Sequence, residues 1–219
     1  MTGSPFDLAF EELPPVIPIF PLTGVLLLPR GRMPLNIFEP RYLAMVSDAL
    51  AFPRLIGMVQ PKEGQGDAGN PPVYDIGCAG RITGFGEIDD GRYEITLTGV
   101  ARFAISEELA LVKGYRPVRA DWTRFRSDLT PAEGGIDRER LLGALKPYLK
   151  RHKVKTDWDA IARTPDERLV HSLAMVCPFA PSEKQGLLEA EGLPARARLL
   201  TALLEMAGAA SPERADVRH

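Results

Sequence analysis

The spacing of apolar residues changes partway along the chain, and this change limits the fold more than any other feature. In the first half the apolar runs are short and are bounded by proline and glycine, which is typical of strands. In the second half they recur every three to four residues, the period of an amphipathic helix. The predicted fold class is therefore α+β, with a β-rich N-terminal half followed by an α-helical bundle. The predicted boundaries are a flexible N-terminus at 1–15, the β-rich half at 16–126, a linker at 127–136, the bundle at 137–208 and a flexible tail at 209–219.

A hairpin gives the clearest strand signal. In "EIDDGRYEITLTGV" the residues Asp89, Asp90 and Gly91 form a turn sequence, and the residues after it alternate between apolar and polar side chains. The run "VIPIFPL" at 16–22 also has strand character, but its two prolines lack the amide hydrogen that a central strand needs, so it is predicted to lie at a sheet edge.

The helical half contains one internal conflict. Leu141, Leu145, Tyr148 and Leu149 form a helical apolar stripe, whereas Pro147 removes the hydrogen bond to the Gly143 carbonyl. We expect a kink or a break at that point.

Composition excludes several classes of protein. The chain has 219 residues, of which 45% are hydrophobic and 26% charged, and its formal net charge is −2, so no global field favours nucleic acid or an anionic membrane. Only two cysteines occur, Cys78 and Cys177, which indicates a reducing compartment. No Lys or Arg precedes Arg30, and the longest apolar run, "GVLLLP", is too short to cross a bilayer. A cytoplasmic protein without membrane contact is expected.

Motifs that carry chemistry are missing from the sequence. It contains no phosphate-binding glycine loop and no metal-ligand spacing of Cys or His residues. The histidines are His152, His171 and His219, and His171, inside a helical segment, is interpreted as structural because no nucleophile has a recognisable position beside it. We expect neither enzyme activity nor any cofactor or metal.

A basic segment at 137–155 leaves two interpretations open. It holds seven Lys or Arg against two acids, which gives a local charge of +5. Such a helix could bind the phosphates of RNA. A solvated helix whose cations complement the helix dipole is the favoured interpretation, so nucleic acid is not the expected partner.

The stretch "LNIFEPRYLAMV", at 35–46, marks a corner between a strand and a helix. Pro40 suits the first position of a helix, and Glu39 places negative charge near the helix start. Arg41 can pair with that carboxylate, and Tyr42 begins the apolar stripe. We interpret Glu39, Pro40, Arg41 and Tyr42 as a structural corner rather than a catalytic group.

Three stretches together resemble the N-terminal substrate-binding domain of the Lon (peptidase S16) proteases. They are "IPIFPLTGVLLLPRGRMPLNIFEPRYLAMV", "IGCAGRITGFGEIDDGRYEITLTGVARFAI" and "PSEKQGLLEAEGLPARARLLTALL". The resemblance covers about residues 15 to 208. It implies a PUA-like pseudo-barrel followed by a helical bundle, and a non-catalytic module that recognises polypeptide substrates. The sequence lacks the ATPase motif of complete Lon proteases, so a stand-alone domain is expected.

The resemblance also implies partners and a mode of binding. The expected partners are unfolded or partly folded polypeptides, a separate ATP-dependent protease that would make this chain an adaptor or chaperone-like protein, and further copies of the chain in a homo-oligomer. Binding would use an apolar groove or an exposed strand edge. The loop "PRGRMP" is predicted as a contact loop, with Met33 as an adaptable apolar side chain between the cations Arg30 and Arg32. The RNA-binding module remains the alternative.

Overall fold

The computed structural model describes residues 8–62, 70–154 and 156–209. Predictions that fall on 1–7, on Lys155 or on 210–219, including His219, lie outside these described residues. The described chain divides into two compact units. The sheet unit comprises the described residues of Met1–Pro131 and Met175–Glu189, and the helical unit those of Ala132–Ala174 and Ala190–His219. The segment 175–189, predicted as part of the bundle, thus belongs to the sheet unit.

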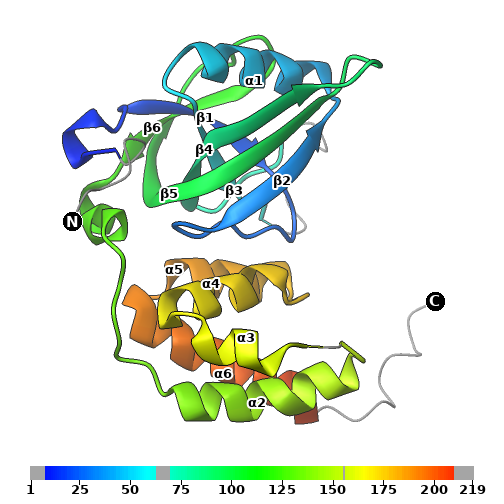
Figure 1. The fold of residues 1–219 in the computed structure, drawn as a ribbon. Helices are drawn as coiled ribbons and strands as arrows, with labels where there is room; N and C mark the ends of the chain where they lie inside the picture. The colour runs from blue at the N-terminus through cyan, green and yellow to red at the C-terminus, as the bar shows by residue number, and fades with distance from the viewer. Residues whose placement is uncertain (1–7, 63–69, 155, 210–219) are drawn as a thin grey trace. The chain divides into compact units, whose positions relative to one another are not determined.

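The sheet unit is built on a barrel (Figure 1). The strand order is β2-β5-β4-β3-β1-β6, and β5 also pairs with β6, so that five strands close on themselves while β2 extends from β5. β5 can pair with β2 and β6 at its two ends because it is 16 residues long. The elements are η1 (Phe10–Glu12), β1 (Val16–Pro21), β2 (Arg32–Ile37), α1 (Pro40–Ala51), β3 (Leu55–Val59), β4 (Ile76–Glu87), β5 (Tyr93–Glu108), β6 (Arg116–Asp121), η2 (Thr123–Leu129) and α5 (Pro181–Glu189).

The predicted hairpin is confirmed and forms the β4–β5 pair. Glu87 lies opposite Tyr93, and the turn between them contains Gly91 at φ +81°, a conformation that glycine adopts without strain. The helix predicted after Glu39 also forms, and α1 begins at Pro40.

The prediction of an edge position for the first strand is wrong. β1 lies between β3, with which it is parallel, and β6, with which it is antiparallel. Pro18 faces Pro117 of β6, so the two residues that cannot donate a hydrogen bond occupy one cross-strand pair. Pairing with β3 begins only at Ile19, beyond Pro18. Proline is tolerated here because the ladder on either side does not need its amide.

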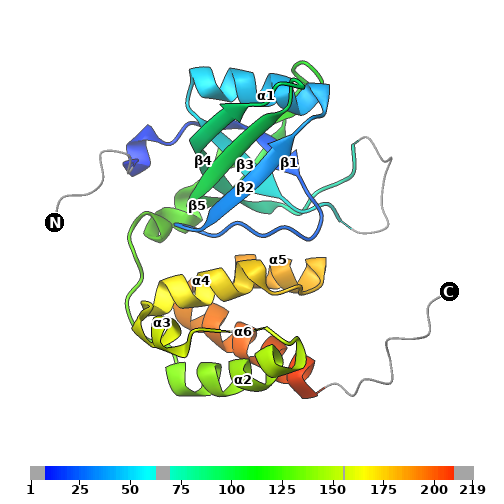
Figure 2. The same ribbon diagram turned by 45° about the vertical axis from the view of Figure 1, so that its right-hand side comes forward.

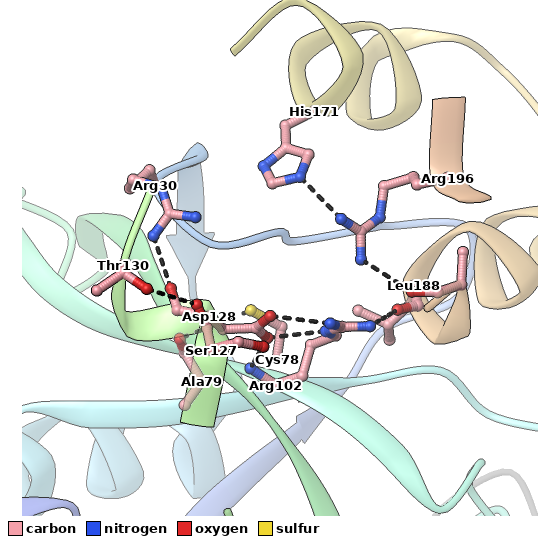
Figure 3. A network of polar contacts seen from close by, with 11 residues as sticks. Arg30, Cys78, Ala79, Arg102, Ser127, Asp128, Thr130, His171, Leu188 and Arg196 are labelled. Atoms are coloured by element: carbon pink, nitrogen blue, oxygen red, sulfur yellow. Dashed lines mark hydrogen bonds and ion pairs between the residues drawn. The ribbon is translucent and has the colours of Figure 1, made fainter. Parts of the chain in front are cut away.

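The barrel interior is apolar and includes Ile17, Ile19, Leu55 and Phe103, all fully buried, with Trp122 at 5.6 Å from the Phe103 ring centroid. One ion pair is buried nearby. Arg102 donates from Nε to Asp128 Oδ2 at 2.8 Å and from Nη2 to Oδ1 at 2.8 Å, as Figure 3 shows. Both side chains are almost completely buried, so water does not solvate their charges. Each charge is compensated by the other.

Hydrogen bonds to backbone carbonyls explain why α5 belongs to the sheet unit. Arg102 Nη1 donates to the Leu188 carbonyl at 3.0 Å (Figure 3), and Gln185 Nε2 donates to the Ile76 carbonyl at 3.1 Å. Lys184, 6% exposed, donates to the Gly24 carbonyl at 2.9 Å, and burial lowers the pKa of its ammonium group. These hydrogen bonds between side chains and distant backbone carbonyls could not be predicted from the helical period alone.

The helical unit contains α2 (Arg138–Arg151), α3 (Trp158–Arg163), most of α4 (Asp166–Val176) and α6 (Gly192–Ala209), drawn in Figures 1 and 2. The predicted break at Pro147 is wrong, because α2 continues through it to Arg151, while a kink there stays a prediction. The carbonyl that loses its partner belongs to Gly143, which has no Cβ, and the Pro147 ring lies beside Gly208 of α6. Packing on α6 therefore holds the helix together across the proline.

His171 is buried, as expected for a structural residue, and its Nε2 lies 2.9 Å from Nη1 of the buried Arg196 (Figure 3). Within the described ranges no helix is both long and apolar enough to serve as a membrane span. The same residues contain no cluster of His, Cys, Asp or Glu that could hold a metal ion.

Candidate functional site

An apolar groove of about 430 Å³ opens on the sheet unit, beside the C-terminal end of α1. It is formed by three segments that lie far apart in the sequence and that the barrel brings together. The lining residues are Val16, Pro18, Asp48, Ala49, Phe52, Pro53, Leu109, Ala110, Val112, Tyr115 and Pro117.

The first wall of the groove is the end of α1. The helix stops at Ala51, and the Arg54 amide donates back to the Ala49 carbonyl at 2.8 Å. Phe52 then takes an extended conformation, and the residue is 80% exposed. A phenylalanine at this exposure keeps its apolar surface in water, so it offers a large area to a ligand.

The second wall is the turn between β5 and β6. Lys113 and Gly114 both have positive φ, +48° and +86°, which is the pattern of a type I′ hairpin turn. Val112 and Tyr115 close the turn through two backbone hydrogen bonds of 2.9 and 3.0 Å. The turn leaves Val112 40% exposed at the groove.

Asp48 joins the two walls. Its carboxylate accepts a hydrogen bond from Lys113 Nζ at 2.6 Å and another from the Tyr115 hydroxyl at 3.0 Å. The hydrogen bond from Lys113 is the largest cause that lowers the pKa of Asp48. Burial, followed by the hydrogen bond to Asp48, raises the pKa of Tyr115 to about 12. At neutral pH the groove therefore keeps an ionised Asp48 and a neutral Tyr115, and these two hydrogen bonds link α1 to the β5–β6 turn.

The floor consists of Val16 and the facing pair Pro18 and Pro117. Since proline has no amide hydrogen, the floor presents apolar surface with few donors. The Tyr115 hydroxyl donates to Asp48, but its pKa, raised to about 12, keeps it protonated at neutral pH. The arrangement of the groove can bury apolar side chains of a ligand, with Asp48 and Lys113 as polar groups at one end.

The predicted structural corner lies next to this groove. Arg41 donates from Nε to Glu39 Oε2 at 3.0 Å, and its guanidinium lies 4.6 Å from the centroid of the Tyr42 ring. Tyr42 in turn packs on Phe20, with ring centroids 4.3 Å apart. Arg41 and Tyr42 also line a small cavity of about 40 Å³, and this cavity shares Tyr115 with the groove. The structural role of the corner stays a prediction.

The predicted contact loop lies away from the groove. Met33 is 7% exposed and so offers little surface to a ligand, whereas Arg32 is exposed on β2. Arg30 is exposed, but its Nη1 donates to the Asp128 carbonyl at 2.6 Å (Figure 3). The loop as a contact site stays a prediction, and of the three residues predicted for it Arg30 and Arg32 are exposed.

Sequence reasoning missed the groove residues. Phe52 stands between a helix and a proline, and nothing local indicates that its ring is exposed. The turn residues Lys113 and Gly114 gave a usable signal, because a Gly at the second position of a two-residue loop between strands favours a type I′ turn. That these segments meet could only be known from the barrel topology.

Comparison with known proteins gives consistent matches. The family model described as "ATP-dependent protease La (LON) substrate-binding domain" matches residues 16–206. Lon protease 2 of Myxococcus xanthus is 28% identical over 198 residues, which are 89% of this chain and 24% of that protein. Lon protease of Anaeromyxobacter dehalogenans is 27% identical over 210 residues, 92% of this chain and 24% of that protein. The chain thus spans about a quarter of the length of these relatives.

Solved structures show the same fold. The Lon N-terminal domain protein from Xanthomonas campestris superposes with a TM-score of 0.61 at 23% identity, covering 85% of this chain and 97% of that one. The N-terminal domain of a Mycobacterium avium complex Lon protease gives a TM-score of 0.61 at 18% identity, covering 86% of this chain and 97% of that one.

Proposed function

We propose, from the premise that this chain belongs to the LON substrate-binding domain family, that its apolar groove binds unfolded or partly folded polypeptides. The family makes the chain a substrate-recognition module. The groove adds a location and a chemistry: apolar side chains of the bound polypeptide would contact Phe52, Val112 and the proline floor. Recognition would proceed without any chemical step on the bound chain.

The single observation that carries this proposal is the exposure of Phe52. This residue is 80% exposed beside a hollow of about 430 Å³ that is lined mainly by apolar side chains. Large apolar side chains that rim a hollow mark interaction sites more often than isolated exposed ones do. A flexible polypeptide can insert one apolar side chain into such a groove and leave its charged residues in water.

Strand addition at β2 is supported less well. Among the described residues β2 pairs only with β5, so its other edge is available to an added strand. Pro34 stands in the middle of β2, however, and cannot donate to an added strand. The groove is therefore the favoured binding site.

The proposed role extends to a proteolytic partner. A module that holds an unfolded chain without cutting it can act as an adaptor, and an ATP-dependent protease would then receive that chain. In a homo-oligomer, several grooves could bind the same polypeptide at once, which would raise the overall affinity. Nothing in the groove favours the RNA-binding alternative, since none of the described residues that line it is a cation, and the nearby Lys113 is paired with Asp48.

Fluorescence anisotropy tests the groove. A labelled globular protein, reduced and alkylated so that it stays unfolded, is titrated with the chain and with its Phe52→Ser variant. We expect saturable binding that persists at high salt, and a loss of about tenfold in affinity, roughly 1.4 kcal/mol, in the variant.

Phe38→Ser is the matched control, because Phe38 is also exposed, at 64%, but does not line the groove. Equal losses in the two variants would contradict the groove as the site. Absence of binding to the unfolded chain, with binding to a labelled RNA instead, would contradict the proposed function itself.

A further inference from the structure

A second hollow, of about 420 Å³, lies entirely in the helical unit, at the C-terminal end of α2. We call it the cationic cleft. It is lined by Lys146, Leu149, Lys150, Val154, Thr156 and Trp158.

The apolar part of the cleft comes from the way α2 ends. Lys153 has φ +54°, its amide donates to the Lys150 carbonyl at 3.2 Å, and the Val154 amide donates to the Leu149 carbonyl at 3.0 Å. This is the Schellman arrangement, which brings the residue after the left-handed position back against the last turn. Val154 therefore lies by Leu149, yet it remains 52% exposed.

Trp158 supplies the aromatic wall. It begins α3, is 39% exposed, and has the Lys146 ammonium at 5.6 Å from its ring centroid. The preceding residue, Asp157, uses its carboxylate to cap α3 by accepting from the Ala160 amide at 3.0 Å. The ring is thus fixed at a helix start while much of its surface stays in water.

The charges of α2 are divided between two roles. Arg138 pairs with Asp166, and Arg140 donates from Nε to Glu205 at 3.0 Å, so the basic residues of the first turn hold the bundle together. In the part of the chain that the structure describes, Lys146 and Lys150 form no ion pair. The cleft therefore presents two cations beside apolar and aromatic surface, and none of the described residues that line it is acidic.

We propose that the cationic cleft binds an acidic segment of polypeptide, inserting an aliphatic side chain between Val154 and Trp158 while flanking carboxylates pair with Lys146 and Lys150. Charge complementarity selects this ligand, because a purely apolar segment would give neither ammonium group an anionic partner. A phosphate backbone would leave Leu149 and Val154 without a partner. It would also approach Asp157 and Asp159, which flank the Trp158 ring.

This inference rests on the proposed function only in taking a polypeptide as ligand. The two sites are separate in the sequence, in their units and in chemistry, so a variant of one leaves the other in place. Phe52→Ser is therefore expected to bind an acidic peptide as the unaltered chain does, whatever the outcome for unfolded proteins.

The test uses a short labelled peptide with a repeated Glu-Leu-Asp pattern, read by fluorescence anisotropy at low and at physiological salt. We expect Lys146→Gln/Lys150→Gln to weaken binding about tenfold, and Trp158→Ala to weaken it by a similar factor. Arg168→Gln/Arg198→Gln is the matched control, because it removes the same charge from exposed positions of the helical unit outside the cleft. It is expected to change affinity by less than about twofold.

Other outcomes overturn the proposal. Equal losses in the two double variants would mean that only net charge matters. A peptide in which Lys replaces both acids should bind more weakly. Equal binding of this peptide would show that Lys146 and Lys150 do not recognise its carboxylates. A third outcome is that the chain binds single-stranded RNA and not the acidic peptide, with Trp158→Ala abolishing the RNA binding. That result would show that the ligand of the cleft is nucleic acid and not a polypeptide.

Discussion

The groove of the sheet unit and the cationic cleft of the helical unit enclose nearly the same volume, about 430 and 420 Å³, but they are made differently. The groove collects residues from 16–18, 48–53 and 109–117, whereas the cleft uses residues from 146–154 and 156–158, close together in the sequence. The groove is apolar and its charges are paired with one another. The cleft keeps two lysines that no described acid neutralises.

This difference shows what each surface depends on. The groove exists only when the barrel holds β1, the end of α1 and the β5–β6 turn side by side. The cleft needs only the end of α2 and the start of α3, so its shape is set mostly by local hydrogen bonds. Loss of stability in one unit should therefore affect one surface and spare the other, and the following variants test this separation.

The largest effect is expected for Asp128→Ala. Removing this carboxylate leaves the buried Arg102 guanidinium without its ion-pair partner, and breaking a buried pair in this way costs about 3–5 kcal/mol in free energy of unfolding. Native-state hydrogen exchange read by mass spectrometry follows both units in one sample. We expect faster exchange in β4 and β5 and weaker binding at the groove, with exchange in α2 unchanged.

Two controls sharpen this experiment. Asp75→Ala removes an exposed acid, 81% exposed in an ion pair with Lys62, and should change stability by less than about 1 kcal/mol. Arg102→Met/Asp128→Leu removes both buried charges and should lose less stability than Asp128→Ala alone. A double variant that is as unstable as the single one would show that packing, not the uncompensated charge, is responsible.

A smaller effect, confined to the other unit, is expected for His171→Leu. Because Arg196 can only donate, the His171 Nε2 at 2.9 Å must accept, and leucine removes this acceptor from a nearly buried guanidinium. The expected loss is about 1–3 kcal/mol, seen as faster hydrogen exchange in α4 and α6. Unfolded-protein binding at the groove should stay as it is. A parallel loss of groove binding would contradict the independence of the two surfaces.

The same contrast between local and distant contacts explains which features could be predicted. The turn at Asp90 and Gly91 and the helix start at Pro40 are encoded by neighbouring residues, and both were found. The interior position of β1 depends on β6, about a hundred residues away, so a rule about proline at edges gave the wrong answer. α2 continues through Pro147 because α6 packs beside it, and the sequence around Pro147 carries no trace of that contact.

The candidate sites follow the same rule. Phe52 and Val112 are unremarkable in the sequence and become a site only when the barrel places them around one hollow. The basic segment 137–155 was visible at once, but its charge alone did not separate Arg138 and Arg140, which hold the bundle, from Lys146 and Lys150, which face a ligand-sized hollow.

A titration isolates the polar contact that joins the groove walls. Since the pKa of Tyr115 is raised to about 12, the unfolded chain releases this phenolic proton near pH 10 and the folded chain does not. Stability from Tyr115 is therefore complete below about pH 10 and is lost as pH rises toward about 12. The difference in phenolate absorbance between the chain and Tyr115→Phe measures the pKa, and Asp48→Asn should lower it. An unchanged pKa in Asp48→Asn would leave burial as its only cause.

The smallest effect is expected at the corner beside the groove. Glu39 and Arg41 form a half-exposed ion pair, with side chains 44% and 32% exposed, so Glu39→Ala should reduce the free energy of unfolding by only about 0.2–1 kcal/mol. Thermal unfolding measures this loss, and anisotropy with the unfolded protein measures binding in the same variant. Arg41 and Tyr42 line the cavity that shares Tyr115 with the groove, so loss of the Glu39–Arg41 ion pair tests whether this cavity takes part in binding. Reduced stability with unchanged binding would support the structural role. Unchanged stability with abolished binding would make the corner a part of the binding surface, and the groove would then extend from Phe52 across Tyr115 to Arg41.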